Sequence, residues 1–369
     1  MKKTALYLFL TICGGIYASC DNDTYSEAGT KDPNATVTTD ISAINASADA
    51  ATYTINVNTT FSEWNAYSND SWIKLHNTNT GNSNGTIDVI LADNYTSRTL
   101  EGSVIIMSGT TRLSIPVTQA ASSTPIEGPD GYEIVWHDEF DTGNQPNAED
   151  WTHEVKPAGW VNSELQNYVD HRSPAGKAVT EIKDGKLRIN CFKEDSNIYS
   201  GRIYAHVDEG WQFGYIEASI KLPKGKGTWP AFWMMPVNYT GWPDSGEIDI
   251  MEEVGGHANY VSSSLHANAH VHTNGTQVTH EMYLEGAEDA FHTYAIKWTA
   301  DNITTYVDGQ VQLSYDNRGL GHDDWPYNAP FYVILNLAWG GSWGGMYGID
   351  EAALPVTMEV DYVRVFQKK

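Results

Sequence analysis

Residues 246–253 read GEIDIMEE, a short acidic stretch whose apolar residues alternate with acids over its first half. In a β-strand, successive side chains point to opposite faces, so Glu247 and Asp249 would share one face and Ile248 and Ile250 the other. Burying the isoleucine face against a core would leave the acids lining a cleft. This stretch therefore predicts a β-sheet that displays carboxyl groups on its open face.

The second half of the stretch poses a problem of parity. In a regular strand Glu253 shares the face of Glu247, and Glu252 points the opposite way. One β-bulge between Asp249 and Glu252 would bring Glu252 to the face of Glu247. The two arrangements select different pairs of carboxyl groups, and strict alternation favours Glu253.

The rest of the chain is also rich in strand-like alternation, and long amphipathic helical stretches are scarce. Residues 36–120 carry short alternating runs separated by Gly, Asn and Ser, which predicts a small immunoglobulin-like β-sandwich. Residues 121–130 are rich in Ser, Thr, Pro and Gly and read as a linker. Residues 131–369 carry the same kind of pattern over a longer region, which suits a concave β-jelly-roll sandwich. We therefore predict an all-β protein.

The composition and net charge of the chain limit the classes of molecule that it can bind. Hydrophobic residues make up 41% of the chain and charged residues 19%, a balance typical of folded proteins. The formal net charge of −25 would repel nucleic acid and other anionic polymers, so a neutral polymer is easier to accept. The 13 Trp and 21 Tyr suit either sugar-stacking surfaces or an ordinary β-rich core, and composition does not choose between them.

The N-terminus has the order of a secretory signal. Residues 1–19 contain a basic start, an apolar segment too short to span a membrane, and a run of small residues. Ala18 and Ser19 precede Cys20, as in a bacterial lipobox. We predict that Cys20 is acylated, that residues 20–35 form a flexible tether, and that the protein is lipid-anchored at the outer membrane, on the cell surface. A plain cleaved signal with an incidental Cys20 is the alternative.

Cysteine usage fits this view. With Cys13 lost in the signal and Cys20 acylated, Cys191 is the one cysteine left, and no internal disulfide can form. Cys191 lies in the alternating run at residues 186–192. We expect it to be a buried strand residue and not a nucleophile.

The decisive stretch belongs to a longer motif. Residues 242–252, WPDSGEIDIME, resemble the signature of glycoside hydrolase family 16 in its bulged Glu-x-Asp-x-x-Glu form. The unbulged form needs an acid where Met251 stands. The resemblance covers about residues 131–367, and its other blocks are residues 136–140, 162–168, 200–203, 227–236, 336–345 and 358–365.

By this resemblance Glu247 is the nucleophile and Glu252 the acid/base of a retaining hydrolase, which cleaves through a covalent glycosyl-enzyme intermediate. Asp249 lies between them and would assist by modulating their ionisation. Three acids in one cleft repel one another, so at least one pKa should rise and favour a protonated acid beside an ionised nucleophile.

Within the family the blocks resemble the laminarinase branch, which is endo-acting on β-1,3-glucan and sometimes on mixed-linkage β-1,3/1,4-glucan. The resemblance implies donor-subsite residues on one side of the acids and His266 near the acid/base; the donor-subsite residues would be Asn162, Arg202, Trp229, Trp233 and Trp242. It implies no cofactor for catalysis, and we expect a monomer.

Three alternatives remain open. The same mechanism could act mainly on mixed-linkage glucan or on a galactan, although the acidic charge argues against sulfated galactans. A non-catalytic, surface glycan-binding lipoprotein could use the same fold. The presence of both Glu247 and Glu252 argues against that third reading, because a pure binder has no need of both acids.

Metal binding is predicted only as a structural feature. Five histidines, His257, His266, His270, His272 and His280, lack the paired spacing of a zinc site. The resemblance instead implies a structural calcium ion, for which the matching positions are Glu139, Gly185 and Asp361. Oxygen ligands, including backbone carbonyls, suit calcium.

The first β-rich region resembles the BACON module of Bacteroidota lipoproteins that process polysaccharides. The matching features are residues 68–73, 94–98 and 115–119. The region could bind sugar or act as a spacer. Trp64 and Trp72 could form a sugar platform, although a tryptophan in a small sandwich is more often part of the core.

Overall fold

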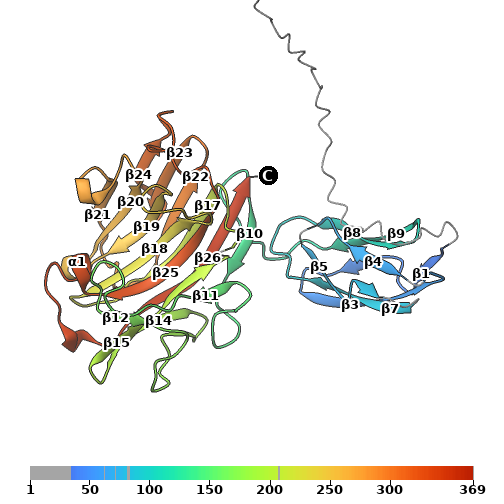
Figure 1. Ribbon diagram of the computed structural model, residues 1–369, viewed down its shortest axis with the longest axis horizontal. Coiled ribbons are helices and arrows are strands. Elements are labelled where there is room, and N and C mark those ends of the chain that lie inside the picture. The colour runs from blue at the N-terminus through green and yellow to red at the C-terminus, as the bar shows by residue number, and fades with distance from the viewer. Residues whose placement is uncertain (1–34, 62, 71, 81–83, 207, 369) are drawn as a thin grey trace, which may run out of the picture. The chain divides into compact units, whose positions relative to one another are not determined.

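A computed structural model of the chain describes residues 35–61, 63–70, 72–80, 84–206 and 208–368. The predicted signal peptide, Cys20 and the tether up to residue 34 lie outside the described residues. The chain divides between Ser123 and Thr124 into two compact units, and each is described by itself (Figure 1). Nearly all regular structure is strand, which confirms the all-β class.

The first unit contains two sheets. One has the order β1 (Val37–Thr39), β3 (Ala51–Thr59), β7 (Asn84–Leu91), β5 (Ile73–His76). The other has the order β2 (Ile44–Ala46), β9 (Thr111–Gln119), β8 (Leu100–Ser108), β4 (Trp64–Tyr67), β6 (Asn79–Thr80). Their inward-facing residues form one hydrophobic core, and Trp64 is buried within it. Because Trp64 is buried, it is a core residue and not an exposed platform. Trp72 is partly buried and packs against the same core.

The second unit also has two sheets. The larger has the order β12 (Gln166–Tyr168), β15 (Asn197–Ser200), β14 (Leu187–Glu194), β26 (Val356–Lys368), β17 (Gly214–Lys221), β22 (His292–Trp298), β23 (Asn302–Val307), β24 (Gln310–Asp316). Two more strands join it, β10 (Tyr132–Asp138) on β26 and β13 (Thr180–Ile182) on β14. The smaller has the order β11 (Trp151–His153), β16 (Arg202–Ala205), β25 (Phe331–Trp339), β18 (Thr228–Pro236), β19 (Glu247–Glu253), β20 (Tyr260–His266), β21 (Val278–Tyr283).

One core joins these two sheets into a sandwich of the predicted jelly-roll type. Alternate residues of β17, such as Ile216 and Ala218, meet alternate residues of β25, such as Leu335 and Leu337, and all four are fully buried. Cys191 of β14 is a buried free cysteine in the same core, as expected from its alternating run. The outward face of the smaller sheet is left to polar and aromatic side chains.

Strand β19 lies between β18 and β20 and contains the β-bulge that parity required (Figure 1). Asp249 pairs with Trp233 of β18 and Met251 with Phe232, so Ile250 is the extra residue. Ile250 and Met251 therefore both enter the core. The Ser263 hydroxyl of β20 donates a hydrogen bond to the Ile250 carbonyl oxygen over 2.7 Å, which gives the displaced carbonyl a partner.

Beyond the bulge, the two adjacent glutamates have opposite surroundings. Glu252 lies on the face of Glu247 and Asp249, whereas Glu253 points inward and is 1% exposed. The Asn259 backbone N–H donates to the Glu253 carboxyl over 2.7 Å. Burial, reinforced by the neighbouring charge of Glu288, raises the pKa of Glu253 to about 8. Strict alternation, which favoured Glu253 as the second cleft acid, was therefore wrong.

Glu253 should make stability depend on pH. Its pKa is raised in the folded state, so the folded protein holds a proton that the unfolded chain releases above about pH 4.5. That stabilising contribution is complete below pH 4.5 and is lost as the pH rises through 8. We expect Glu253→Gln to be more stable than the wild type at pH 8 by roughly 2–4 kcal/mol and to match it near pH 4.5.

Denaturant unfolding followed by tryptophan fluorescence between pH 4.5 and 8 would measure this difference. Glu285→Gln, at an exposed glutamate of the same region, is the matched control and should follow the wild type. A difference between wild type and Glu253→Gln that does not change with pH would contradict the assignment.

Candidate active site

The open face of β19 gathers three carboxyl groups. The bulge places Glu252 beside Asp249 and Glu247, and the facing residues on β20 are Ser262, Ser264 and His266. His266 Nε2 lies 3.2 Å from Asp249 Oδ2, an ion contact without hydrogen-bond geometry. His266 is thus closer to Asp249 than to the predicted acid/base.

Tryptophan side chains lie beside both outer acids. The Trp229 Nε1–H donates to Glu252 Oε1 over 3.0 Å, which favours the ionised form of that carboxyl group and fixes its direction. Trp242, in the loop before β19, lowers the pKa of Glu247. Both tryptophans were predicted from the sequence as substrate-binding residues. The structure shows in addition that they lie beside the catalytic acids.

Burial of like charges dominates the electrostatics of the site. Burial raises the pKa of Glu247 to about 8, with repulsion from Asp249 as the next cause. Burial also raises the pKa of Asp249 to about 7 and that of Glu252 well above its usual range. The three groups titrate as one coupled set, and at neutral pH they cannot all be ionised.

The neighbours of the two outer acids differ. At Glu247 the charge of Asp249 raises the pKa, whereas His266, Arg202 and Trp242 lower it. At Glu252 the Trp229 hydrogen bond and His266 lower the pKa, but the charges of both Asp249 and Glu247 raise it, and it ends well above its usual range. The arrangement therefore favours a proton on Glu252 and a negative charge on Glu247, which is the division of roles that a retaining hydrolase needs.

Arg202 of β16 is held in an aromatic cage beside the acids. Its guanidinium carbon lies 4.6 Å from the ring centre of Trp233 and 5.2 Å from that of Trp160. Its Nε lies 2.6 Å from Glu154 Oε2 in a largely buried ion pair. Sequence reasoning found Arg202 and Trp233 but missed Trp160 and Glu154. Trp160 lies two residues before the predicted Asn162, and that closeness was the available signal.

Asn162 is connected to this region through buried polar groups. Its side chain donates to Glu164 Oε1 over 3.2 Å, and Gln166 donates to the other Glu164 oxygen over 2.7 Å. Tyr168 accepts a hydrogen bond from Asn336, which in turn accepts one from the Trp233 indole over 2.7 Å. Burial raises the pKa of Glu164. Asn336 was also missed, although it lies in one of the matching blocks.

Both carboxylates among the predicted calcium ligands, those of Glu139 and Asp361, already interact with basic side chains. Glu139 accepts hydrogen bonds of 2.8 and 2.7 Å from Arg364. Burial raises the pKa of Glu139, but hydrogen bonds and charges from His137 and Arg364 outweigh burial and lower the pKa to about 2. Asp361 lies 3.3 Å from Lys186 Nζ. An ion held by Glu139, Gly185 and Asp361 would have to use backbone carbonyls and compete with Lys186, so calcium stays a prediction.

The five histidines considered for zinc do not form one cluster, although the rings of His266 and His272 lie 5.5 Å apart. His266 contacts Asp249, His270 contacts Asp324 over 2.7 Å, and the His257 ring stacks on Tyr260 at 3.9 Å.

Within the described parts of the chain, no helix is long and apolar enough to cross a membrane.

Comparison with known proteins gives the site its context. Residues 168–364 match the family described as glycosyl hydrolases family 16. A β-glucanase of Rhodothermus marinus is 39% identical over 245 residues, which cover 64% of this chain and 85% of the relative. The solved structure of a non-specific endo-β-1,3(4)-glucanase is 40% identical with a TM-score of 0.61, over 66% of this chain and 94% of that one. The laminarinase of Rhodothermus marinus is 36% identical with a TM-score of 0.61, over 64% and 98%.

The ion pair of Arg202 and Glu154 should matter for folding. The side chains are 10% and 12% exposed, so removing one charge leaves the other buried without its partner. We expect Glu154→Gln to lower the free energy of unfolding by about 3 kcal/mol, measured by denaturant unfolding at pH 7. Asp289→Asn, which breaks the exposed pair with Lys224, is the control and should cost less than about 1 kcal/mol. Equal losses in the two variants would contradict this reading.

Proposed function

Because the chain belongs to glycosyl hydrolases family 16, we propose that this retaining glycoside hydrolase cleaves β-1,3-glucan within the polymer chain. The observation that carries the proposal is the bulged strand β19, which presents Glu247, Asp249 and Glu252 on one open face. The proposal extends to mixed-linkage β-1,3/1,4-glucan as a second substrate. The endo-β-1,3(4)-glucanase and the laminarinase among the solved structures support this substrate class.

The reaction uses the two outer acids in turn. Glu252 donates its proton to the glycosidic oxygen as that bond breaks, and the Glu247 carboxylate bonds to the anomeric carbon to form a glycosyl ester. Glu252, now ionised, takes a proton from water as the water oxygen attacks the same carbon. The ester bond breaks, Glu247 regains its charge, and the sugar leaves with its original anomeric configuration.

Repulsion between the acids adjusts the proton affinity of Glu252 during this cycle. In the free site, the charges of Asp249 and Glu247 both raise the pKa of Glu252, which favours the acid form. Ester formation removes the Glu247 charge, so the pKa of Glu252 falls and its base form becomes more accessible. The second step needs that base form. Asp249 lies on the same face of β19 between the two glutamates, and Glu247 lowers its pKa.

A neutral β-glucan suits the surroundings better than the alternatives. The net charge of −25 opposes sulfated galactans and other polyanions. The partly exposed side chains of Trp160 and Trp242, at 39% and 37%, offer apolar surface for contact with sugar rings. A purely glycan-binding role would not require three carboxyl groups on one open face with the Trp229 indole hydrogen-bonded to Glu252.

Endo action is supported by a second aromatic surface beyond Glu252. Tyr260 lies on the open face of β20, two residues from Ser262, and pairs with Tyr283 of β21. Both tyrosines are exposed, at 37% and 56%, and their rings lie 5.4 Å apart. Tyr347 contributes a further exposed ring beside His257. Sugars on the leaving-group side would bind here, while Arg202 and its tryptophans serve the other side.

The N-terminal part of the chain extends the proposal to location. We propose that acylated Cys20 anchors the enzyme at the outer membrane surface and that the first β-sandwich, a BACON-type module, holds the catalytic unit away from the membrane. The support for both is the sequence pattern of residues 1–120.

Substitution of three glutamates tests the proposed roles. We expect Glu247→Gln and Glu252→Gln each to lower the rate of laminarin cleavage by about 10³-fold or more, because each removes a group that bonds or transfers a proton. Glu253→Gln, which changes the buried neighbour, should retain activity within about tenfold. Reducing-sugar release and sizing of the products measure the rates, and proton NMR of the first product reports the anomeric configuration.

Circular dichroism of each variant would establish that it is folded. Normal cleavage by Glu247→Gln would refute the nucleophile assignment, and equal losses in Glu252→Gln and Glu253→Gln would refute the roles drawn from the bulge. If the wild type cleaves no β-glucan among laminarin, lichenan and barley glucan, the proposed substrate class is wrong.

The aromatic surface beyond Glu252 has its own test. We expect Tyr283→Ala to lower kcat/KM on laminarin by about tenfold, because stacking of the aromatic ring on a sugar face is lost. An aryl β-laminaribioside places no sugar on that side of the bond, so its kcat/KM should be unchanged. Equal effects on both substrates would place Tyr283 outside the leaving-group side of the cleft.

A further inference from the structure

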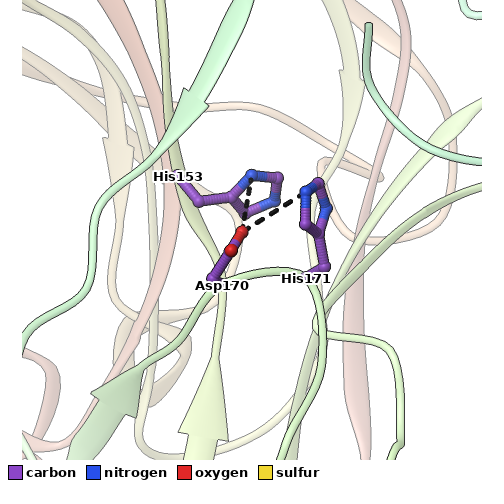
Figure 2. Close-up of side chains that lie close together, drawn as sticks. All are labelled: His153, Asp170 and His171. Atoms are coloured by element: carbon purple, nitrogen blue, oxygen red, sulfur yellow. Dashed lines mark ion pairs between the residues drawn. The ribbon is translucent and has the colours of Figure 1, made fainter. Parts of the chain in front are cut away.

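A second group of potential metal ligands lies apart from the three cleft acids. His153 ends the edge strand β11, and Asp170 and His171 follow the end of β12 by two and three residues. Figure 2 shows both imidazole rings beside the Asp170 carboxylate. His153 Nδ1 lies 3.7 Å and His171 Nε2 lies 3.3 Å from the same Asp170 oxygen. All three ligand atoms lie within 4.8 Å of one another.

These separations match those around a small metal ion. Zinc binds imidazole nitrogen and carboxylate oxygen at about 2.0–2.2 Å, so ligand atoms at tetrahedral angles are about 3.4 Å apart. The two nitrogen–oxygen separations, 3.3 and 3.7 Å, bracket that value. One ion could therefore bind with small side-chain rotations and no movement of the backbone.

The rings are oriented by contacts on their far sides. His153 Nε2 lies 2.6 Å from the Thr180 hydroxyl oxygen, which directs Nδ1 toward Asp170. An outer partner of this kind fixes the tautomer of a metal-binding histidine. His171 adopts φ +52°, and its carbonyl accepts a hydrogen bond from the Val179 N–H over 2.8 Å. Histidine is one of the residues that tolerate a left-handed backbone, and the His171 ring lies against that of His153, with ring centres 4.0 Å apart.

Burial and charge also suit a divalent cation. The His153 side chain is 3% exposed, that of His171 32% and that of Asp170 67%, so the group is open to solvent on one side only. The guanidinium of Arg172 donates to the Gly176 carbonyl oxygen, and among the described residues no ion pair joins it to the Asp170 carboxylate. Two imidazoles and one carboxylate are a donor set that zinc and similar transition metals prefer.

We propose that His153, Asp170 and His171 bind one divalent transition-metal ion, with zinc as the best match, and that the ion joins strand β11 to the segment after β12. The joined segments frame the Arg202 side of the cleft. Glu154, next to His153, pairs with Arg202, and Tyr168, two residues before Asp170, hydrogen-bonds to Glu164. The ion would therefore stabilise the cleft wall without touching the reacting atoms. The proposal is independent of the substrate proposed above.

Zinc titration of purified, tag-free full-length protein stripped with a chelator tests the site. We expect isothermal titration calorimetry to find zinc bound at this site, and saturating zinc to raise the Tm by about 5 °C. Asp170→Asn changes an exposed side chain and His171→Ala a partly exposed one, so both variants should fold, but each should weaken zinc binding by about tenfold or more. His280→Ala removes an exposed histidine elsewhere and is the matched control. Cobalt in place of zinc should give visible absorption bands that His171→Ala loses.

The cleft itself provides the competing explanation, because Glu247, Asp249 and His266 also lie close enough to hold an ion. Asp249→Asn separates the two sites. A Tm shift that persists in Asp249→Asn and disappears in His171→Ala supports the proposal. A shift that disappears in Asp249→Asn and persists in His171→Ala overturns it, and so does the absence of any shift in the wild type.

Discussion

One extra residue in strand β19 is the constraint on which the catalytic site depends. Ile250 is accommodated as a bulge because both it and Met251 find room in the core, and because Ser263 gives the displaced carbonyl a hydrogen bond. The bulge reverses the alternation of side chains after Asp249. Glu252 is thereby moved into the cleft and Glu253 into the interior, so a packing event in the core decides which carboxyl group meets the substrate.

The acids in turn depend on the groups around them. Three carboxyl groups in a buried site would repel one another strongly, and their raised pKa values show the cost of taking them out of water. Tryptophan side chains and Arg202 offset part of that cost at Glu247 and Glu252. Arg202 needs Glu154 for its own charge, so the edge strand β11 contributes to the electrostatics of β19 across three intervening strands.

Much of this could be predicted from the sequence. Period-two alternation predicted the all-β class. The bulge was implied only by the resemblance to family 16, in which Met251 stands where the unbulged motif has an acid. Sequence reasoning missed groups whose role comes only from tertiary contacts. Glu154 belongs to no local pattern, and Trp160 only neighbours one. Asn336 lies in a matching block, but its contacts with Trp233 and Tyr168 come from distant strands. His153 and His171 are 18 positions apart in the sequence, and only the pairing of β11 with the sheet edge and the turn after β12 bring their rings together.

The bulge also means that this strand could be built with one residue fewer and still place three acids on one face. Deleting Ile250 would shorten the stretch to Glu-Ile-Asp-Met-Glu-Glu, in which the first three acids again occupy every second position. Strict alternation would then suffice to place them on one face, with the single methionine filling the core where two side chains stood. The phase of the side chains, and not the number of residues between the acids, is therefore what this sheet must preserve.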